Sequence, residues 1–203
     1  MRKLLAGLAL ITVSMMSSAT EEPNYEVFEQ IGKFEIRRYS PYIVAEVLVE
    51  GPADKAGGQA FPILAGYIFG ENKGEQKFAM TAPVTQTNVP IQMPMTAPVT
   101  QAAAAGGYLV QFVLPRGMVL ASAPEPTDKR IRLREVAANQ VAVIVFSGFW
   151  SEANYQENLS KLQAMLKGKE LTWVGEPIYA RYNPPFTPWF MRRNEIWLTL
   201  PPG

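Results

Sequence analysis

The chain contains an internal repeat, in which residues 36–51 align without a gap on residues 133–148 at an offset of 97 residues. The two copies read IRRYSPYIVAEVLVEG and LREVAANQVAVIVFSG. The identical positions are Arg37/Arg134, Val44/Val141, Ala45/Ala142 and Gly51/Gly148. Each copy is rich in β-branched residues and ends in a glycine, a pattern that predicts a strand, a short turn and a second strand. The repeat therefore predicts two similar halves whose strand pairs are related by an approximate two-fold axis.

A helical pattern follows each copy of the repeat. The second helix is expected to begin after Ser151, a preferred N-cap residue, and to end at Gly168. Its apolar residues recur at helical spacing: Tyr155, Leu159, Leu162 and Leu166. The first helix is expected to begin near Pro52, to kink or restart near Pro62, and to end by Gly70. Both halves therefore place a helix after their second strand.

Further strands are predicted at residues 108–114, 176–182 and 195–200, where apolar positions alternate or cluster. The strand at residues 140–147 is apolar on both faces and is expected to be covered on both. About eight antiparallel strands with two helices at matching places predict an α+β fold. We expect the two halves to close into a pseudo-symmetric curved sheet or distorted barrel, with the helices packed outside it.

A second, local repeat is exact in sequence, since Met80–Gln86 recurs unchanged as Met95–Gln101. Its β-branched residues and proline suit an edge strand or a strand that enters a bulge. Residues 87–94 are then expected to form a hairpin-like loop. The two repeated methionines, Met80 and Met95, are possible soft metal ligands, but a methionine that opens an apolar strand is more typical of core packing.

The composition excludes several classes of chemistry, because neither cysteine nor histidine occurs among the 203 residues. Disulfides, thiol nucleophiles, Cys/His zinc sites, Ser-His-Asp triads and imidazole ligation of haem are all excluded. The formal charge of +1 and the lack of a basic run argue against a nucleic-acid partner. We find no carboxylates paired at a catalytic spacing and do not expect an enzyme.

Residues 1–19 have the three parts of a secretory signal peptide. Arg2 and Lys3 precede an apolar stretch, and small residues follow up to Ala19. The stretch is shorter than the roughly 20 residues that a bilayer span needs. We expect cleavage after Ala19, export to the periplasm or outside the cell, and no stable membrane anchor in the mature domain at residues 20–203. An uncleaved anchor is the alternative.

Four segments together resemble the SOUL/haem-binding protein family. They read KFAMTAPV (77–84), QFVLP (111–115), VAVIVFSGFWSE (141–152) and ARYNPPFTPWFMRRNEIWL (180–198). The resemblance extends over residues 25–200 and implies one domain, a distorted antiparallel β-barrel of two βαββ-type halves with two flanking helices. It also implies similarity to the small-molecule effector-binding domains of bacterial transcription regulators.

The resemblance implies non-covalent binding of haem or another tetrapyrrole in a surface groove. This groove would lie between the first helix and the loop before the last strand. The helix would contribute Phe61, Leu64, Ala65 and Ile68. The loop would contribute Phe186, Trp189, Phe190 and Met191, with Arg192 and Arg193 for the propionates. A purely structural interpretation is that Phe61 and Leu64 face the core, while the arginine pair fixes the last strand through Glu195.

Three functions from different classes remain open at this point. The first is a tetrapyrrole carrier, scavenger or buffer, with Met, Tyr, Lys, water or nothing as the axial ligand and no metal site of the protein's own. The second is a general binder of apolar or cationic small molecules, in which Glu195 supplies the charge. The third, an enzyme restricted to Glu, Tyr or Lys as acid and base, is the least favoured. The oligomeric state is not predicted.

Overall fold

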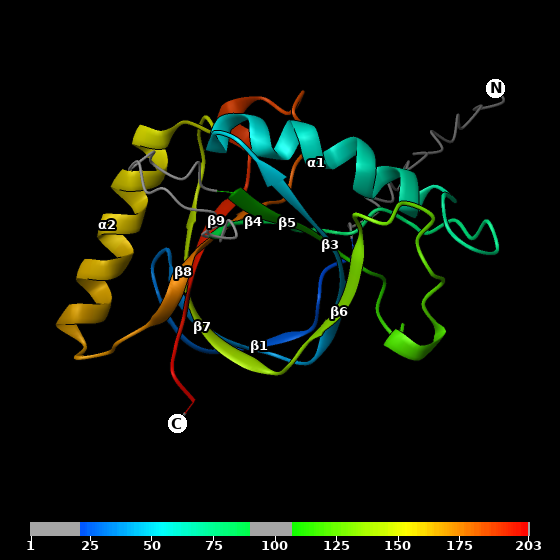
Figure 1. Ribbon diagram of the computed structural model, residues 1–203. Helices are drawn as coiled ribbons and strands as arrows, with labels where there is room; N and C mark the ends of the chain where they lie inside the picture. The colour runs from blue at the N-terminus through cyan, green and yellow to red at the C-terminus, as the bar shows by residue number, and fades with distance from the viewer. Residues whose placement is uncertain (1–20, 90–106, 203) are drawn as a thin grey trace, which may run out of the picture.

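A nine-stranded antiparallel sheet organises the computed structural model, which describes residues 21–89 and 107–202. The sheet curls into a half-barrel, and both helices pack on its outside (Figure 1). The strands run in the order β1-β2-β7-β9-β8-β4-β5-β3-β6. Their bounds are β1 Tyr25–Ile31, β2 Phe34–Tyr39, β3 Tyr42–Glu50, β4 Val84–Val89, β5 Gly107–Val113, β6 Arg132–Val136, β7 Asn139–Phe146, β8 Val174–Arg181 and β9 Asn194–Thr199.

The strand order shows the two halves directly. In one half of the sheet the order is β6-β3-β5-β4, and in the other half it is β2-β7-β9-β8. Each of these strands thus has an equivalent in the other half: β2 corresponds to β6, β3 to β7, β4 to β8 and β5 to β9. Helix α1 (Ala53–Ile68) follows β3, and helix α2 (Glu152–Gly168) follows β7, at equivalent places. The predicted pseudo-two-fold α+β fold is therefore confirmed, and the paired strands β4 and β8 lie at its centre.

The repeated residues pair with one another between the halves. Arg37 of β2 lies opposite Val141 of β7, and Arg134 of β6 lies opposite Val44 of β3. The two strands of each copy do not form a hairpin together. Strand β2 pairs with β1 and β7, whereas β3 pairs with β5 and β6. The short turn at residues 40–41 thus carries the chain from one half of the sheet to the other.

The helices begin and end as their local sequences indicate. The Ser151 hydroxyl accepts a hydrogen bond of 3.3 Å from the Asn154 backbone N–H at the start of α2. The apolar face predicted for α2 is buried. Helix α1 starts after Pro52 and continues through Pro62 as one helix, so the predicted restart there does not occur. Gly70 follows its end with a φ of +115°, a conformation that glycine adopts without steric cost.

The core has three parts, because most strands bury both faces. Helix α1 covers β3 and β5, and α2 covers β7 and β9. The third part fills the concave interior around Tyr39, Val143 and Trp197. Along β7, Ala142 and Ile144 contact the α2 cluster, whereas Val141 and Val143 belong to the interior, so this strand is covered on both faces as predicted.

Some predicted features lie outside the described residues. These are the signal peptide at residues 1–19 and the second copy of the local repeat, Met95–Gln101. In the first copy, Met80 packs against the α1 core cluster, as expected of an apolar filler. Strand β4 extends to Val89, so part of the predicted loop is strand. The predicted edge position is wrong, because β4 pairs with both β5 and β8. Among the residues described, no helix has the length and hydropathy required to span a bilayer.

Candidate ligand-binding site

The residues predicted on the first helix do not form one wall of a surface groove. Leu64 is 0% exposed, and Ala65 and Ile68 are buried with it against β3 and β5. This part of the prediction is wrong, because the apolar face of α1 is the face that the sheet covers. Phe61 is half-exposed and packs edge-on against Phe112, with 5.5 Å between the ring centroids.

The predicted loop residues form an exposed aromatic surface beside the start of α2. The Trp189 ring stacks on Phe149 at 5.4 Å and meets Phe190 edge-on at 5.6 Å. Phe190 is 61% exposed and Phe186 is 88% exposed. We call Phe149, Trp189 and Phe190 the aromatic platform. Sequence analysis missed Phe149, although it lies in the quoted segment VAVIVFSGFWSE.

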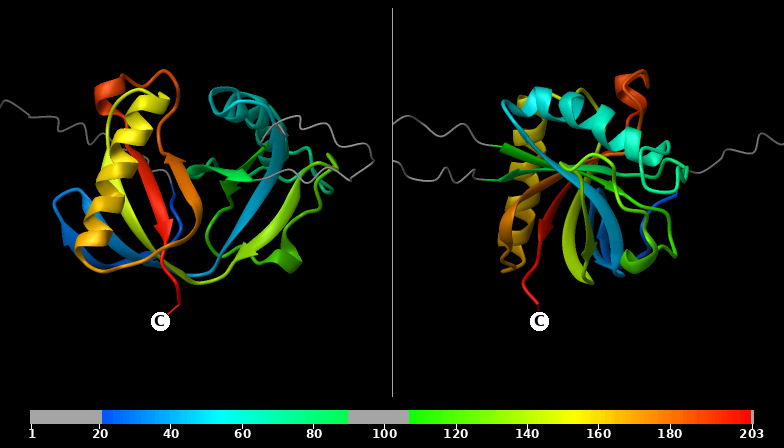
Figure 2. Two further views of the ribbon diagram at one scale, coloured as in Figure 1. Left: turned by 60° about the vertical axis from the view of Figure 1, so that its left-hand side comes forward. Right: turned by 45° about the vertical axis from the view of Figure 1, so that its right-hand side comes forward.

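The platform is held by the backbone and by Arg192. The Gly148 N–H donates to the Trp189 carbonyl at 3.0 Å, which ties the loop to the segment before α2. Arg192 donates to the carbonyls of Thr187 and Pro185, at 2.8 and 2.6 Å, and its guanidinium lies over the Trp150 ring. Figure 2 shows the loop, in orange-red, standing beside the upper end of α2. Arg192 thus places a positive charge next to exposed rings.

The second predicted cation, Arg193, is committed elsewhere. Its guanidinium donates to Glu195 at 2.9 Å and to Glu22 at 2.8 Å, and it lies 3.8 Å from the Tyr182 ring centroid. Two carboxylates already neutralise it. These contacts agree with the structural interpretation, a link to Glu195, and binding of a ligand's propionate by Arg193 stays a prediction.

Glu195 lies inside the half-barrel and is 0% exposed. Arg37 donates to its two carboxylate oxygens at 2.9 and 3.0 Å, and Tyr182 and Trp197 each donate at 2.7 Å. Burial by itself would raise the pKa of this carboxyl, but its bonds to Arg37 and the charge of Arg193 hold the pKa below its ordinary value. Glu195 is therefore no site for a ligand's charge, because protein donors saturate it.

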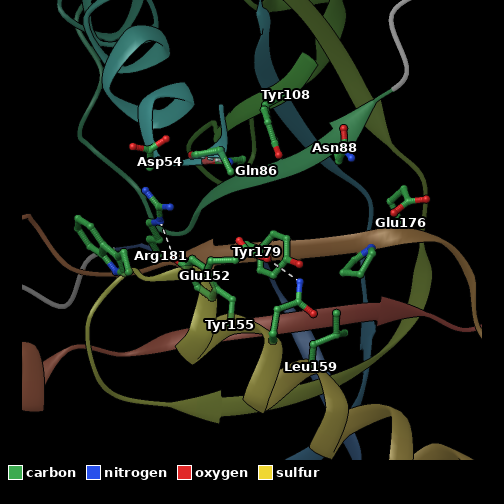
Figure 3. Close-up of a pocket in the computed structure, with 14 residues that line it drawn as sticks. Asp54, Gln86, Asn88, Tyr108, Glu152, Tyr155, Leu159, Glu176, Tyr179 and Arg181 are labelled. Atoms are coloured by element: carbon green, nitrogen blue, oxygen red, sulfur yellow. Dashed lines mark hydrogen bonds between the residues drawn. The ribbon is translucent and has the colours of Figure 1, made fainter. Parts of the chain in front are cut away.

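A separate cavity of about 430 Å³ lies where the two halves meet. Its floor is the outer face of β4 and β8, and its rim includes the first turns of α1 and α2 (Figure 3). Three carboxylates, those of Asp54, Glu152 and Glu176, and one guanidinium, that of Arg181, line it. None of the residues predicted to bind a ligand does so. Acidic residues are common in the first turn of any helix, so Asp54 and Glu152 carried no signal for sequence analysis.

Four aromatic side chains also line this cavity: Tyr108, Trp150, Tyr155 and Tyr179. Burial and the nearby charge of Glu152 raise the pKa of Tyr179 to about 12. Burial also raises the pKa of Tyr155, although Arg181, which donates to its hydroxyl at 3.0 Å, opposes the shift. Both phenols are therefore neutral at physiological pH.

Arg181 of the cavity lining contacts both helices. Arg181 Nη1 lies against α1, where a Cβ on Gly57 would be only 3.1 Å from it. The opposite wall, on the α2 side, carries the Trp150 and Tyr155 rings. The Arg181 guanidinium lies 4.8 Å from the first ring centroid and 5.8 Å from the second. The absence of a side chain at Gly57 of α1 thus leaves room for the Arg181 guanidinium beside the aromatic rings of the α2 side.

The comparison with known families is decisive for the chain as a whole. The SOUL heme-binding protein family matches residues 20–199. The chain belongs to this family. Heme-binding protein 2 of Mus musculus is 31% identical to this SOUL-family chain over 186 residues, covering 89% of the chain and 86% of the relative.

Solved structures with the same fold have little sequence in common with this SOUL-family chain. The C-terminal domain of EcmrR, a protein also solved in complex with DNA, has a TM-score of 0.58 at 10% identity, covering 88% of this chain and 99% of that domain. A hydrolase from Listeria innocua has a TM-score of 0.55 at 11% identity, covering 86% and 94%. These likenesses establish the fold alone.

The predicted loop of this SOUL-family chain combines flat apolar surface with positive charge. The described residues contain no cluster of three metal-ligating His, Cys, Asp or Glu side chains, and the full sequence has no histidine. The aromatic platform offers flat apolar surface, and Arg192 adds a cation beside it. A porphyrin ring with propionates needs both features.

Proposed function

We propose that this protein binds haem or another tetrapyrrole non-covalently on the aromatic platform. The observation that carries the proposal is the exposed, mutually packed set of Phe149, Trp189 and Phe190 beside a guanidinium, in a chain of the SOUL heme-binding family. Isolated exposed rings are common on protein surfaces, whereas a contiguous exposed apolar patch indicates an interaction site. Phe186, Phe61 and Met191, all exposed, are proposed to extend the contact.

Each group has a separate role in this proposal. The platform rings stack on the porphyrin face, and Arg192 pairs with a propionate while its backbone bonds keep the loop in shape. Haem would supply redox-active iron when bound. Because imidazole is absent, an axial ligand to that iron has to come from Met, Tyr, Lys or water, and Met191 is the exposed candidate beside the platform.

We further propose a carrier, scavenger or buffer that acts after export, and not an enzyme. The signal-peptide pattern at residues 1–19 supports export to the periplasm or beyond. The curated relatives are heme-binding proteins, which supports a binding role. The alternative of a general binder of small molecules no longer rests on Glu195, because that side chain is buried and saturated.

The test is a titration of the purified mature protein with hemin and with protoporphyrin IX. We expect a shifted Soret band with hemin and quenching of tryptophan fluorescence with both ligands, since Trp189 would lie against the ring. Binding of both at similar affinity would indicate stacking, whereas binding of hemin alone would indicate that a metal bond dominates. The absence of binding by either ligand would contradict the proposal.

A further inference from the structure

The cavity between the two helices carries an excess of negative charge. Asp54, Glu152 and Glu176 bring three carboxylates, and Arg181 brings one positive charge. The N-terminus of each helix adds a partial charge of about +0.5. The balance over the lining residues and helix ends is therefore about −1, because three carboxylates lie against one guanidinium and two helix ends. Arg192 adds a positive charge beside the cavity, 4.4 Å from the Trp150 ring centroid. A tetrapyrrole with ionised propionates would be repelled here, and a cation would be attracted.

A buried acceptor in the same cavity lacks a donor. Gln86 of β4 lines the cavity and is only 5% exposed. Its Nε2 donates to the Ala53 carbonyl at 3.1 Å, which fixes the orientation of the amide. Its Oε1 is buried and has no hydrogen-bond partner in the part of the chain that the structure describes. Buried polar atoms are nearly always paired, so an unpaired acceptor at a cavity wall points to a ligand that carries an N–H or O–H donor.

The aromatic walls of the cavity already hold one cation of the protein, the Arg181 guanidinium. The Arg181 guanidinium lies over the rings of Trp150 and Tyr155, at 4.8 and 5.8 Å from their centroids. Tyr108 and Tyr179 add further aromatic surface to the same cavity. Figure 3 shows these two tyrosines and the Glu152 carboxylate around one space. Aromatic rings and carboxylates together are the usual lining of sites for organic cations.

We propose that this cavity is a second ligand site, which binds a monovalent organic cation with N–H donors on a flat apolar body, such as an aromatic amine or amidine. The charge of the ligand pairs with Glu152 and Asp54, its N–H donates to Gln86 Oε1, and its body lies against Tyr108 and Tyr179. A volume of about 430 Å³ suits a small aromatic molecule. This site shares no lining residue with the aromatic platform.

The probe that tests this proposal is 4-aminobenzamidine, a fluorescent monovalent cation, with neutral 4-aminobenzamide as its matched control. The two have nearly the same shape and differ in charge. We expect the amidine to bind at least tenfold more tightly than the amide, and its binding to weaken as salt is added. Equal affinities of the two compounds, or an affinity insensitive to salt, would overturn the assignment of a cation site.

Variants then locate the binding. Glu152→Gln removes one carboxylate from the cavity and is expected to weaken amidine binding about tenfold. Glu157→Gln removes the same charge from the same helix outside the cavity, where Glu157 pairs with Lys161 on the surface, and is expected to change binding less than twofold. Circular dichroism checks that both variants are folded. Equal losses in the two variants would show that the amidine responds to overall charge and would refute the site.

Gln86→Leu tests the unpaired acceptor without changing the charge. It is expected to lower the affinity for the amidine several-fold, since the ligand's N–H then loses its acceptor. Hemin provides the cross-check: Glu152→Gln should leave hemin affinity unchanged, and Trp189→Ala should leave amidine affinity unchanged. These two results separate a failure of the cation site from a failure of the tetrapyrrole proposal. Coupled losses in both assays would mean that the two ligands share one site.

Discussion

Arg37 donates two hydrogen bonds, of 2.9 and 3.0 Å, to the carboxylate of Glu195 in the interior of the half-barrel. Both side chains are almost wholly buried, and the pair joins β2 to β9 across β7. Removing one member of a buried ion pair leaves the other charge without its partner, which costs about 3–5 kcal/mol.

Glu195→Ala is therefore expected to lower the free energy of unfolding by about 3–5 kcal/mol, measured by urea denaturation. The control is Glu29→Ala, which breaks a surface pair with Lys169 and should cost about 1 kcal/mol or less. A loss for Glu195→Ala no larger than that of the control would contradict the central role given to this pair.

The same carboxyl gives a pH-dependent prediction. Its pKa in the folded state lies below the ordinary value of 4.5, so its contribution to stability is present above that value and is lost as the pH falls through the folded pKa. The difference in unfolding free energy between the wild type and Glu195→Gln should be constant near neutral pH and should shrink below pH 4.5. Denaturation curves recorded across the acid range test this, and a difference that grows on acidification would be the wrong sign.

Trp189→Ala tests the aromatic platform. Loss of one stacking ring is worth roughly 1–3 kcal/mol by analogy with bases on aromatic side chains, which corresponds to about 5- to 150-fold weaker hemin binding. Thermal stability should fall only modestly, because the ring is half-exposed. Phe28→Ala is the matched control, because Phe28 of β1 is an exposed ring that lies beside a cation, Arg38 of β2. If Trp189→Ala left hemin affinity unchanged but severely destabilised the fold, the loop would have a structural role and would not bind the ligand.

Leu64→Ala separates the core from the site on α1. Leu64 is fully buried, so truncation should destabilise the fold by about 2–5 kcal/mol and leave the hemin affinity of the folded fraction unchanged. Leu162→Ala on α2, buried to the same degree, should behave alike. Hemin affinity reduced by Leu64→Ala but not by Leu162→Ala would restore Leu64 to the binding surface.

The prediction of a cleaved signal peptide at residues 1–19 is independent of the fold. The exported protein should begin at Thr20 or within a few residues of it, since Ser17 and Ala19 are the small residues expected before a cleavage site. Mass spectrometry of the exported fraction measures this. Membrane-bound protein that retains residues 1–19 would show an uncleaved anchor instead.

The fold could be predicted because the repeat aligns residues that pair between the halves. Arg37 of the first copy lies opposite Val141 of the second, and Arg134 of the second copy lies opposite Val44 of the first. Positions that align in the sequence therefore have equivalent partners in the sheet. Strand β1 escaped prediction because its apolar residues do not alternate throughout, and a bulge between Val27 and Glu29 shifts its register.

The site was harder to predict, because burial and binding use the same residue types. Leu64 and Ile68 have the spacing of a core face and also the chemistry of a porphyrin groove, and only the packing of α1 on the sheet distinguishes the two. The sequence indicated Arg193 as a partner of Glu195, but it could not indicate Arg37, which lies in the other half of the chain. The cavity joins Gln86, Glu152 and Tyr179 from three distant segments, a conjunction that only the folded chain creates.

The position of that cavity at the junction of two similar halves has a consequence for selectivity. Two identical subunits meeting on a two-fold axis would present each group twice, so the rings of Trp150 and Tyr155 on one wall would require the same rings on the other. Here both halves belong to one polypeptide, and the first turn of α1 contributes Ala53 and Asp54 to the cavity instead. Single-residue replacements can therefore reshape one wall at a time, which allows a pseudo-symmetric scaffold to recognise a molecule whose two ends differ.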